Sequence, residues 1–201
     1  MSELFSIQLQ NRQQQGRDGV WLDLPTTTEQ VQAALRQIGI SSDNPQGLFI
    51  SGYFAEEEKR FAIPYNMVLA SNVDELNFLA ARLETLSAGE RAELNAALQA
   101  PQSELSSIGK ITDFPENVEY YVYLPDVRGP AQLGDYYLNR SGMVNMPDEW
   151  KGGIDTAQFG RYVAQQEQGV FTEYGYFVKS GDAWQKVHEG QPVPEEYRVL
   201  S

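Results

Sequence analysis

The sequence predicts an α+β protein made of three small units in a row. In the N-terminal third, segments in which apolar and polar residues alternate, as in strands, lie on both sides of one amphipathic helix. In the middle third, apolar residues recur at helical spacing after N-cap residues. The C-terminal third returns to short aromatic strands and helices. We expect domains at residues 1–70, 71–112 and 113–185, followed by an extended tail at 186–201.

The first unit is predicted to have the order β-β-α-β. Residues 4–10 alternate loosely, and the run VWLDL at 20–24 forms a second strand that Pro25 ends. These two strands make a hairpin with a long loop. Residues 26–40 begin with threonines suited to an N-cap and place apolar residues at helical spacing. The run GLFISGYF at 47–54 supplies the third strand.

The middle unit is predicted to be helical. A helix follows Asn72, which forms a capping box with Glu75 at the third helical position. A second helix opens after Ser87 and stops before Pro101. Residues 103–111 fit a third, shorter helix.

The last unit combines strands with helices. Residues 118–124 (VEYYVYL) predict a strand, because aromatic and β-branched residues favour that conformation. Helices are expected at 131–142 and 154–166, with a loop between them. Residues 169–180 predict a β-hairpin that turns near Gly175.

The composition excludes several classes of protein. The 201 residues include 28 acidic and 15 basic ones, which gives a net charge of −13, and there is no cysteine. A protein so poor in cations does not bind nucleic acid or an anionic membrane surface in the ordinary way. The lack of cysteine excludes disulfide scaffolds, zinc–thiolate sites and thiol nucleophiles. With no signal peptide or membrane span in the sequence, we expect a cytoplasmic protein.

No pattern of residues predicts catalysis. The only histidine, His188, lies in the polar tail, where we expect it to be solvated. Phosphate-binding, dinucleotide-binding and calcium-loop motifs are missing, and paired carboxylates arise by chance in so acidic a chain. We therefore expect no enzyme activity, no cofactor and no metal. A deep pocket lined by coupled carboxylates would reopen that question.

The negative charge is concentrated between residues 72 and 126. This stretch has three basic residues and ten acidic ones: Asp74, Glu75, Glu84, Glu90, Glu93, Glu104, Asp113, Glu116, Glu119 and Asp126. Carboxylates one helical turn apart are spaced like the closely set phosphates of DNA, so such a surface could enter a basic DNA-binding groove. The alternative is an ordinary acidic surface that keeps the protein in solution.

Four segments, in order along the chain, resemble the ArdA antirestriction family. Residues 109–142, with YLP and LGDYY, resemble a family segment with tyr-x-x-leu-pro followed by leu-gly-x-tyr-tyr. Residues 154–182, with FGRY and GVFTEYGY, are similar to the segment that follows. Two further matches are the strand and helix at 20–40 and the helical pattern at 73–98.

The resemblance implies a fold and a partner. It implies an elongated homodimer of three-domain chains whose surface mimics bent duplex DNA. The mimic would occupy the DNA-binding groove of type I restriction-modification enzymes, chiefly their methyltransferase-specificity core. The ten carboxylates between residues 72 and 126 would then be the phosphate surrogates. The family's members are often carried by mobile genetic elements.

This sequence departs from the family pattern at two places. Tyr162 follows Gly160 and Arg161 where the family often has aspartate. Amides also stand in the middle unit where acids are more frequent: Asn77, Asn95, Gln99 and Gln102. Both departures remove carboxylates from the proposed mimic.

Two further alternatives remain open at this level. The acidic surface could serve an adaptor that binds another basic, DNA-associated protein instead of a restriction enzyme. The tyrosines of the last unit could form a dimer contact or pack within the core. They are Tyr120, Tyr121, Tyr123, Tyr136 and Tyr137.

Overall fold

The computed structural model describes residues 4–14, 18–41, 44–57, 60–101 and 103–200. It is a mixed α+β fold, 43% helical and 16% strand, with two small antiparallel sheets. This confirms the predicted fold class.

The chain divides into two compact units, each built from separated segments. The first unit comprises Met1–Ser87, Glu104–Glu116 and Gln185–Ser201, and the second comprises Ala88–Ser103 and Asn117–Trp184. The predicted three-domain arrangement is therefore not confirmed, and its boundaries stay a prediction.

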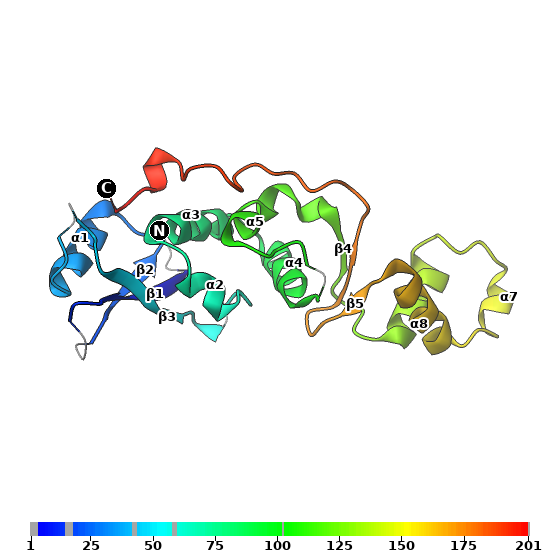
Figure 1. The fold of residues 1–201 in the computed structure, drawn as a ribbon. Coiled ribbons are helices and arrows are strands. Elements are labelled where there is room, and N and C mark those ends of the chain that lie inside the picture. The colour runs from blue at the N-terminus through cyan, green and yellow to red at the C-terminus, as the bar shows by residue number, and fades with distance from the viewer. Residues whose placement is uncertain (1–3, 15–17, 42–43, 58–59, 102, 201) are drawn as a thin grey trace. The chain divides into compact units, whose positions relative to one another are not determined.

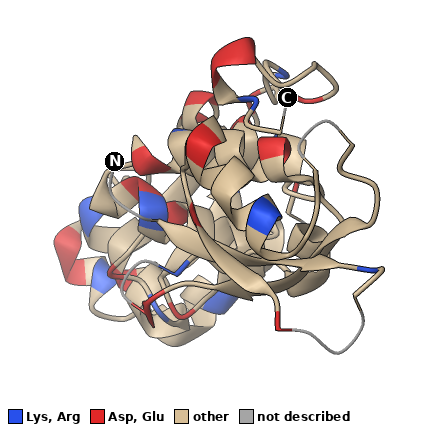
Figure 2. Ribbon diagram, turned by 90° about the vertical axis from the view of Figure 1, so that its left-hand side faces the viewer, with Lys and Arg blue, Asp and Glu red and all other residues tan. Residues whose placement is uncertain are grey.

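The first unit contains the predicted three-stranded sheet. Strands β1 (Phe5–Asn11), β2 (Val20–Leu24) and β3 (Leu48–Phe54) pair in the order β2-β1-β3, with both pairings antiparallel. Alternate side chains of β1, among them Ile7 and Leu9, are fully buried. The three strands carry one charged residue, Asp23, and the acidic and basic positions seen in Figure 2 lie mostly on helices and loops.

Helix α1 (Thr28–Gln37) forms where the sequence predicts a helix and packs against β2. Thr27 is its N-cap and forms a capping box with Gln30. Its apolar stripe, which includes Val31 and Leu35, is buried. Gly39 has φ +69°, the left-handed conformation that favours glycine just past a helix end.

Three more helices of the first unit pack against the sheet or against each other. Helix α3 (Val73–Glu84) is capped by the predicted Asn72–Glu75 box. Its apolar stripe is buried and consists of Val73, Leu76, Leu79, Ala80 and Leu83. Helix α5 (Ile108–Thr112) packs on α3 and is shorter than expected. The sequence patterns did not predict helix α2 (Tyr65–Leu69). A 3₁₀ turn, η2 (Phe114–Glu116), follows α5.

The C-terminal segment is part of the first unit. Residues 185–200, which we call the C-terminal strap, run beside α5 and α3 and contain the 3₁₀ turn η5 (Glu195–Tyr197) (Figure 1). Asn77 on α3 accepts a hydrogen bond from the Thr26 N–H and donates one to the Tyr197 carbonyl, which joins the strap to α3 and the loop after β2.

The second unit contains the other sheet and helix α4 (Ala88–Gln99). Strands β4 (Tyr121–Leu124), β5 (Val170–Phe171) and β6 (Tyr176–Lys179) form an antiparallel sheet in the order β4-β6-β5. The predicted hairpin is thus confirmed, whereas the start of the predicted strand at 118 is a 3₁₀ turn, η3 (Val118–Tyr120).

Helices of the second unit cross at very short range. Helix α6 (Pro130–Asp135) continues as the π-helical turn η4 (Tyr136–Arg140) and packs on α8 (Thr156–Glu167). A Cβ atom on Gly134 would lie 1.9 Å from the Thr156 carbonyl oxygen, and one on Gly160 would lie 1.8 Å from the Pro130 oxygen. Both positions therefore require glycine. The short helix α7 (Asp148–Lys151) lies in the segment predicted as a loop.

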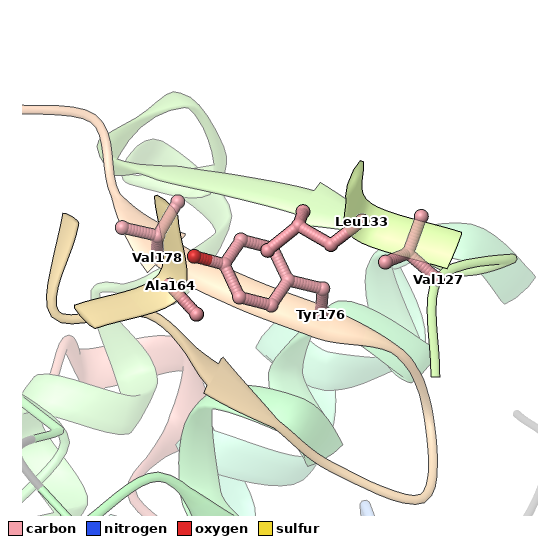
Figure 3. Close-up of a cluster of buried hydrophobic side chains, with 5 residues drawn as sticks. All are labelled: Val127, Leu133, Ala164, Tyr176 and Val178. Atoms are coloured by element: carbon pink, nitrogen blue, oxygen red, sulfur yellow. The ribbon is translucent and has the colours of Figure 1, made fainter. Parts of the chain in front are cut away.

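The core of the second unit surrounds Tyr176. In Figure 3 its ring lies between Leu133 and the pair formed by Ala164 and Val178, with Val127 completing the cluster. The Tyr176 hydroxyl donates to Glu167 Oε2 at 3.0 Å, and the Tyr137 hydroxyl donates to Oε1 of the same carboxylate. Burial, together with Glu167, raises the pKa of both tyrosines.

The other tyrosines also pack within the second unit. Tyr121 is buried with its ring centroid 4.3 Å from that of Phe177. Tyr120 meets Trp184 edge to face at 5.2 Å. Of the two roles left open for the tyrosine cluster, the structure supports core packing.

Candidate partner-binding surface

The ten predicted carboxylates are shared between the two units. Those of the first unit are Asp74, Glu75, Glu84, Glu104, Asp113 and Glu116, and those of the second are Glu90, Glu93, Glu119 and Asp126. The ten acids differ in exposure and in their partners, so they are not equivalent binding groups.

Asp113 is not a surface carboxylate, and for this residue the prediction is wrong. Its side chain is fully buried after helix α5. It accepts backbone N–H groups of the strap from Val187 at 3.3 Å, His188 at 2.6 Å and Glu189 at 3.2 Å. A carboxylate with three such donors anchors a chain segment and cannot face a partner.

Asp74 and Glu75 lie at the start of α3, and both accept hydrogen bonds from backbone N–H groups. Asp74 is partly buried, and its Oδ1 accepts the N–H groups of Val199 at 2.8 Å and Leu200 at 3.0 Å. Glu75 is exposed, and its Oε2 accepts the Asn72 N–H at 3.2 Å. Because Glu75 makes one such bond at the surface, it stays accessible to a partner.

Two other acids of the first unit are paired with cations. Glu116 forms an ion pair with Arg82, and His188 Nε2 lies 4.0 Å from the same carboxylate. Glu104 lies 3.7 Å from the Lys110 ammonium group. Ion pairs of this kind at a surface are weak, so a cation of the partner can replace the Arg82 or Lys110 side chain. Glu84 is partly buried near the end of α3.

Glu93 is the most perturbed carboxyl of the ten. It is partly buried on α4, and its Oε1 has no hydrogen-bond partner among the described residues. Burial, with a smaller contribution from the neighbouring Glu90, raises its pKa to about 7. Glu93 therefore carries only about half a charge at neutral pH in the free protein.

Glu119 and Asp126 flank strand β4 and are exposed. Together with Glu75 they are the predicted acids best placed to meet a partner.

Sequence patterns missed the roles of two polar residues. His188, predicted to be solvated, donates its backbone N–H to Asp113 and places its ring edge-on to Phe78, with centroids 5.0 Å apart. Asn77, interpreted as a lost surface acid, is buried and holds the strap. Asn95 is buried too, and Gln102 lies outside the described residues. The partners of His188 and Asn77 include residues more than 70 positions away, so no local pattern could reveal these roles.

Within the described ranges, no helix is long and apolar enough to cross a membrane.

Comparison with known proteins identifies a family for this chain. A search of curated proteins found no similar sequence. The family model described as antirestriction protein (ArdA) matches residues 15–178, most of the chain, and stops short of the C-terminal strap. This chain therefore belongs to the ArdA family of antirestriction proteins.

Proposed function

We propose that this protein inhibits type I restriction-modification enzymes by occupying the DNA-binding groove of their methyltransferase-specificity core. The observation that carries the proposal is the family match over residues 15–178. The excess of 28 acidic over 15 basic residues supports a basic groove as the target. Inhibition of this kind is competitive binding, and it needs no catalytic group, cofactor or metal.

The acidic surface supports this proposal with a smaller set of carboxylates than the sequence suggested. Glu75, Glu119 and Asp126 are exposed, and Glu84, Glu90, Glu104 and Glu116 can contribute. Asp74 and Glu93 contribute less, since one bonds the strap and the other is half protonated near pH 7. Each cation of the groove that meets a carboxylate replaces a contact it makes with a DNA phosphate.

The assembly and location belong to the same proposal. We propose an elongated three-domain chain that forms a homodimer in the cytoplasm through its C-terminal part. Exposed Met143, Trp150 and Tyr162 in the second unit support such a contact, because large apolar side chains at a surface often mark an interface.

A restriction assay with two charge-matched variants tests the proposal. The test variant carries Glu75→Gln, Glu84→Gln, Glu119→Gln and Asp126→Asn. The control carries Asp18→Asn, Glu29→Gln, Glu195→Gln and Glu196→Gln, four exposed acids outside the predicted set. We expect the unmodified protein and the control to block cleavage by a type I enzyme, and the test variant to need about tenfold more protein.

Two results would contradict the proposal. If several type I enzymes cleave DNA as fast with micromolar protein as without it, these enzymes are not the target. If both variants inhibit equally weakly, the predicted surface is not the binding surface, because net charge alone would then explain inhibition. In the first case, capture of a different basic protein from a host lysate would favour the adaptor.

A further inference from the structure

The first unit contains a cavity of about 740 Å³ beside the C-terminal strap. Its lining comes from the end of α2, the first turns of α3, the start of α5 and residues 188–193 of the strap. Pockets of roughly 300–1,000 Å³ are the usual size for small-ligand sites, so a single side chain would fill only part of this cavity. The proposed function uses one of its lining residues, Glu75, but assigns the cavity no occupant.

One part of the lining is apolar. Phe78 is buried on α3, and its ring contacts the rings of His188 at 5.0 Å and Tyr197 at 4.8 Å. Met67, Ile108 and Val193 add aliphatic surface to the same cavity. A ligand that fits here needs an apolar stem as well as any polar group.

The charged part of the lining is predominantly negative. The carboxylates of Asp74, Glu75 and Glu189 line the cavity with one guanidinium group, that of Arg198. The Arg198 Nε donates to the Val193 carbonyl at 2.7 Å, so this cation is tied to the strap itself. Two carboxylates in the first turn of α3 oppose an anion at that helix end. The cavity is therefore suited to a cation.

We propose that this cavity receives the side chain of an arginine from the partner protein. The three-carbon stem would pack on the apolar lining, and the guanidinium would meet Glu75 and Glu189. Arginine fits better than lysine, because its planar guanidinium is weakly hydrated and bonds carboxylates in pairs. The inference rests on the proposed function in one respect, that the partner is a basic DNA-binding protein.

The two carboxylates differ in their accessibility. Glu75 is exposed and accepts the Asn72 N–H. Glu189 is partly buried, and its Oε2 has no hydrogen-bond partner among the described residues, although the ammonium group of the exposed Lys186 lies 3.3 Å from it. Many interfaces obtain specificity from a single anchoring side chain, with the surrounding charges guiding the approach.

His188 makes the test direct, because it is the only histidine of the chain and lines the cavity. Its imidazole signals in an NMR spectrum can be followed while N-acetyl-arginine amide is added to the full-length protein. The matched probe is N-acetyl-citrulline amide, which has the same shape and no charge. We expect saturable shifts with the arginine probe, at a Kd on the order of millimolar, and none with citrulline.

Paired variants locate the binding groups. Glu75→Gln with Glu189→Gln should weaken binding of the arginine probe by about tenfold. Glu195→Gln with Glu196→Gln removes the same charge from exposed positions outside the cavity and should change nothing. Glutamine at position 75 can still accept the Asn72 N–H, and the His188 signals also report whether each variant is folded.

Three results would overturn the proposal of an arginine site. The first is no saturable shift with the arginine probe, and the second is equal shifts with both probes. The third is equal weakening of arginine binding by both variants. The titration contains no restriction enzyme, so its failure is distinct from failure of the inhibition assay. If the protein inhibits a type I enzyme but does not bind the arginine probe, the proposed function stands and the arginine site is excluded.

Discussion

Asp113 shows how far the role of one acid can differ from its sequence context. Neighbouring acids such as Glu116 are exposed, yet Asp113 is fully buried under three backbone donors of the strap. The distinction depends on residues 74–76 positions away, which no local pattern contains. Sequence reasoning could count the carboxylates but could not separate anchors from surface groups.

Asp113→Asn should destabilise the protein by about 3 kcal/mol, because an amide replaces one acceptor oxygen with a donor that faces other donors. Urea denaturation measures the change. The matched control is Asp126→Asn, the same substitution at an exposed position, which should cost under about 0.5 kcal/mol. Equal costs at the two positions would contradict the anchoring role.

Glu93 predicts a pH dependence of stability with a definite sign. Its pKa in the folded protein is about 7 against an ordinary 4.5, so the folded state holds the proton more tightly. Between these two values the folded protein binds more protons than the unfolded chain, and stability falls as pH rises. The cost is fully present above about pH 7 and disappears below about pH 4.5.

Glu93→Gln should therefore raise Tm relative to the unmodified protein at pH 8 and make little difference at pH 4.5. Partial exposure limits the gain to about 1–2 kcal/mol. Thermal melts at the two pH values measure it, with Glu119→Gln as the exposed control. A gain that is the same at both pH values would show that the buried charge is not its cause.

At the scale of elements, local signals predicted most of the fold. The N-cap at the threonines before α1, the capping box at Asn72 and the strand patterns at 4–10 and 20–24 act over a few residues, and all are confirmed. Helix α2 was missed because five residues after Pro64 are too few to show a helical period. The contacts of the segment predicted as an extended tail could not be foreseen, because its bonds to Asp74 and Asn77 span more than 100 positions.

The crossing of α6 and α8 gives an element-scale prediction. Gly160→Ala should destabilise the second unit by about 3 kcal/mol, since the added methyl group would lie 1.8 Å from the Pro130 oxygen and force the helices apart. Thermal unfolding measures it. Gly152→Ala is the control, because a Cβ there meets nothing within 4 Å. Similar Tm values for the two variants would contradict the close crossing.

At the scale of the whole molecule, the net charge of −13 needs to be read with its distribution. Ten of the acids lie between residues 72 and 126, but the fold assigns them to both units. One is buried, one is half protonated and two are paired with cations. The surface that remains is less charged than duplex DNA, so specific anchors such as the arginine cavity gain importance for a protein that competes with DNA.

The central claim is competition with DNA for one groove, and a displacement measurement tests it most directly. A fluorescent duplex bearing the recognition site is bound to a type I methyltransferase-specificity core, and the protein is added at several DNA concentrations. The claim predicts full displacement, with the midpoint rising in proportion to the DNA concentration. A midpoint that does not move with DNA concentration, or a duplex that stays bound, would contradict it.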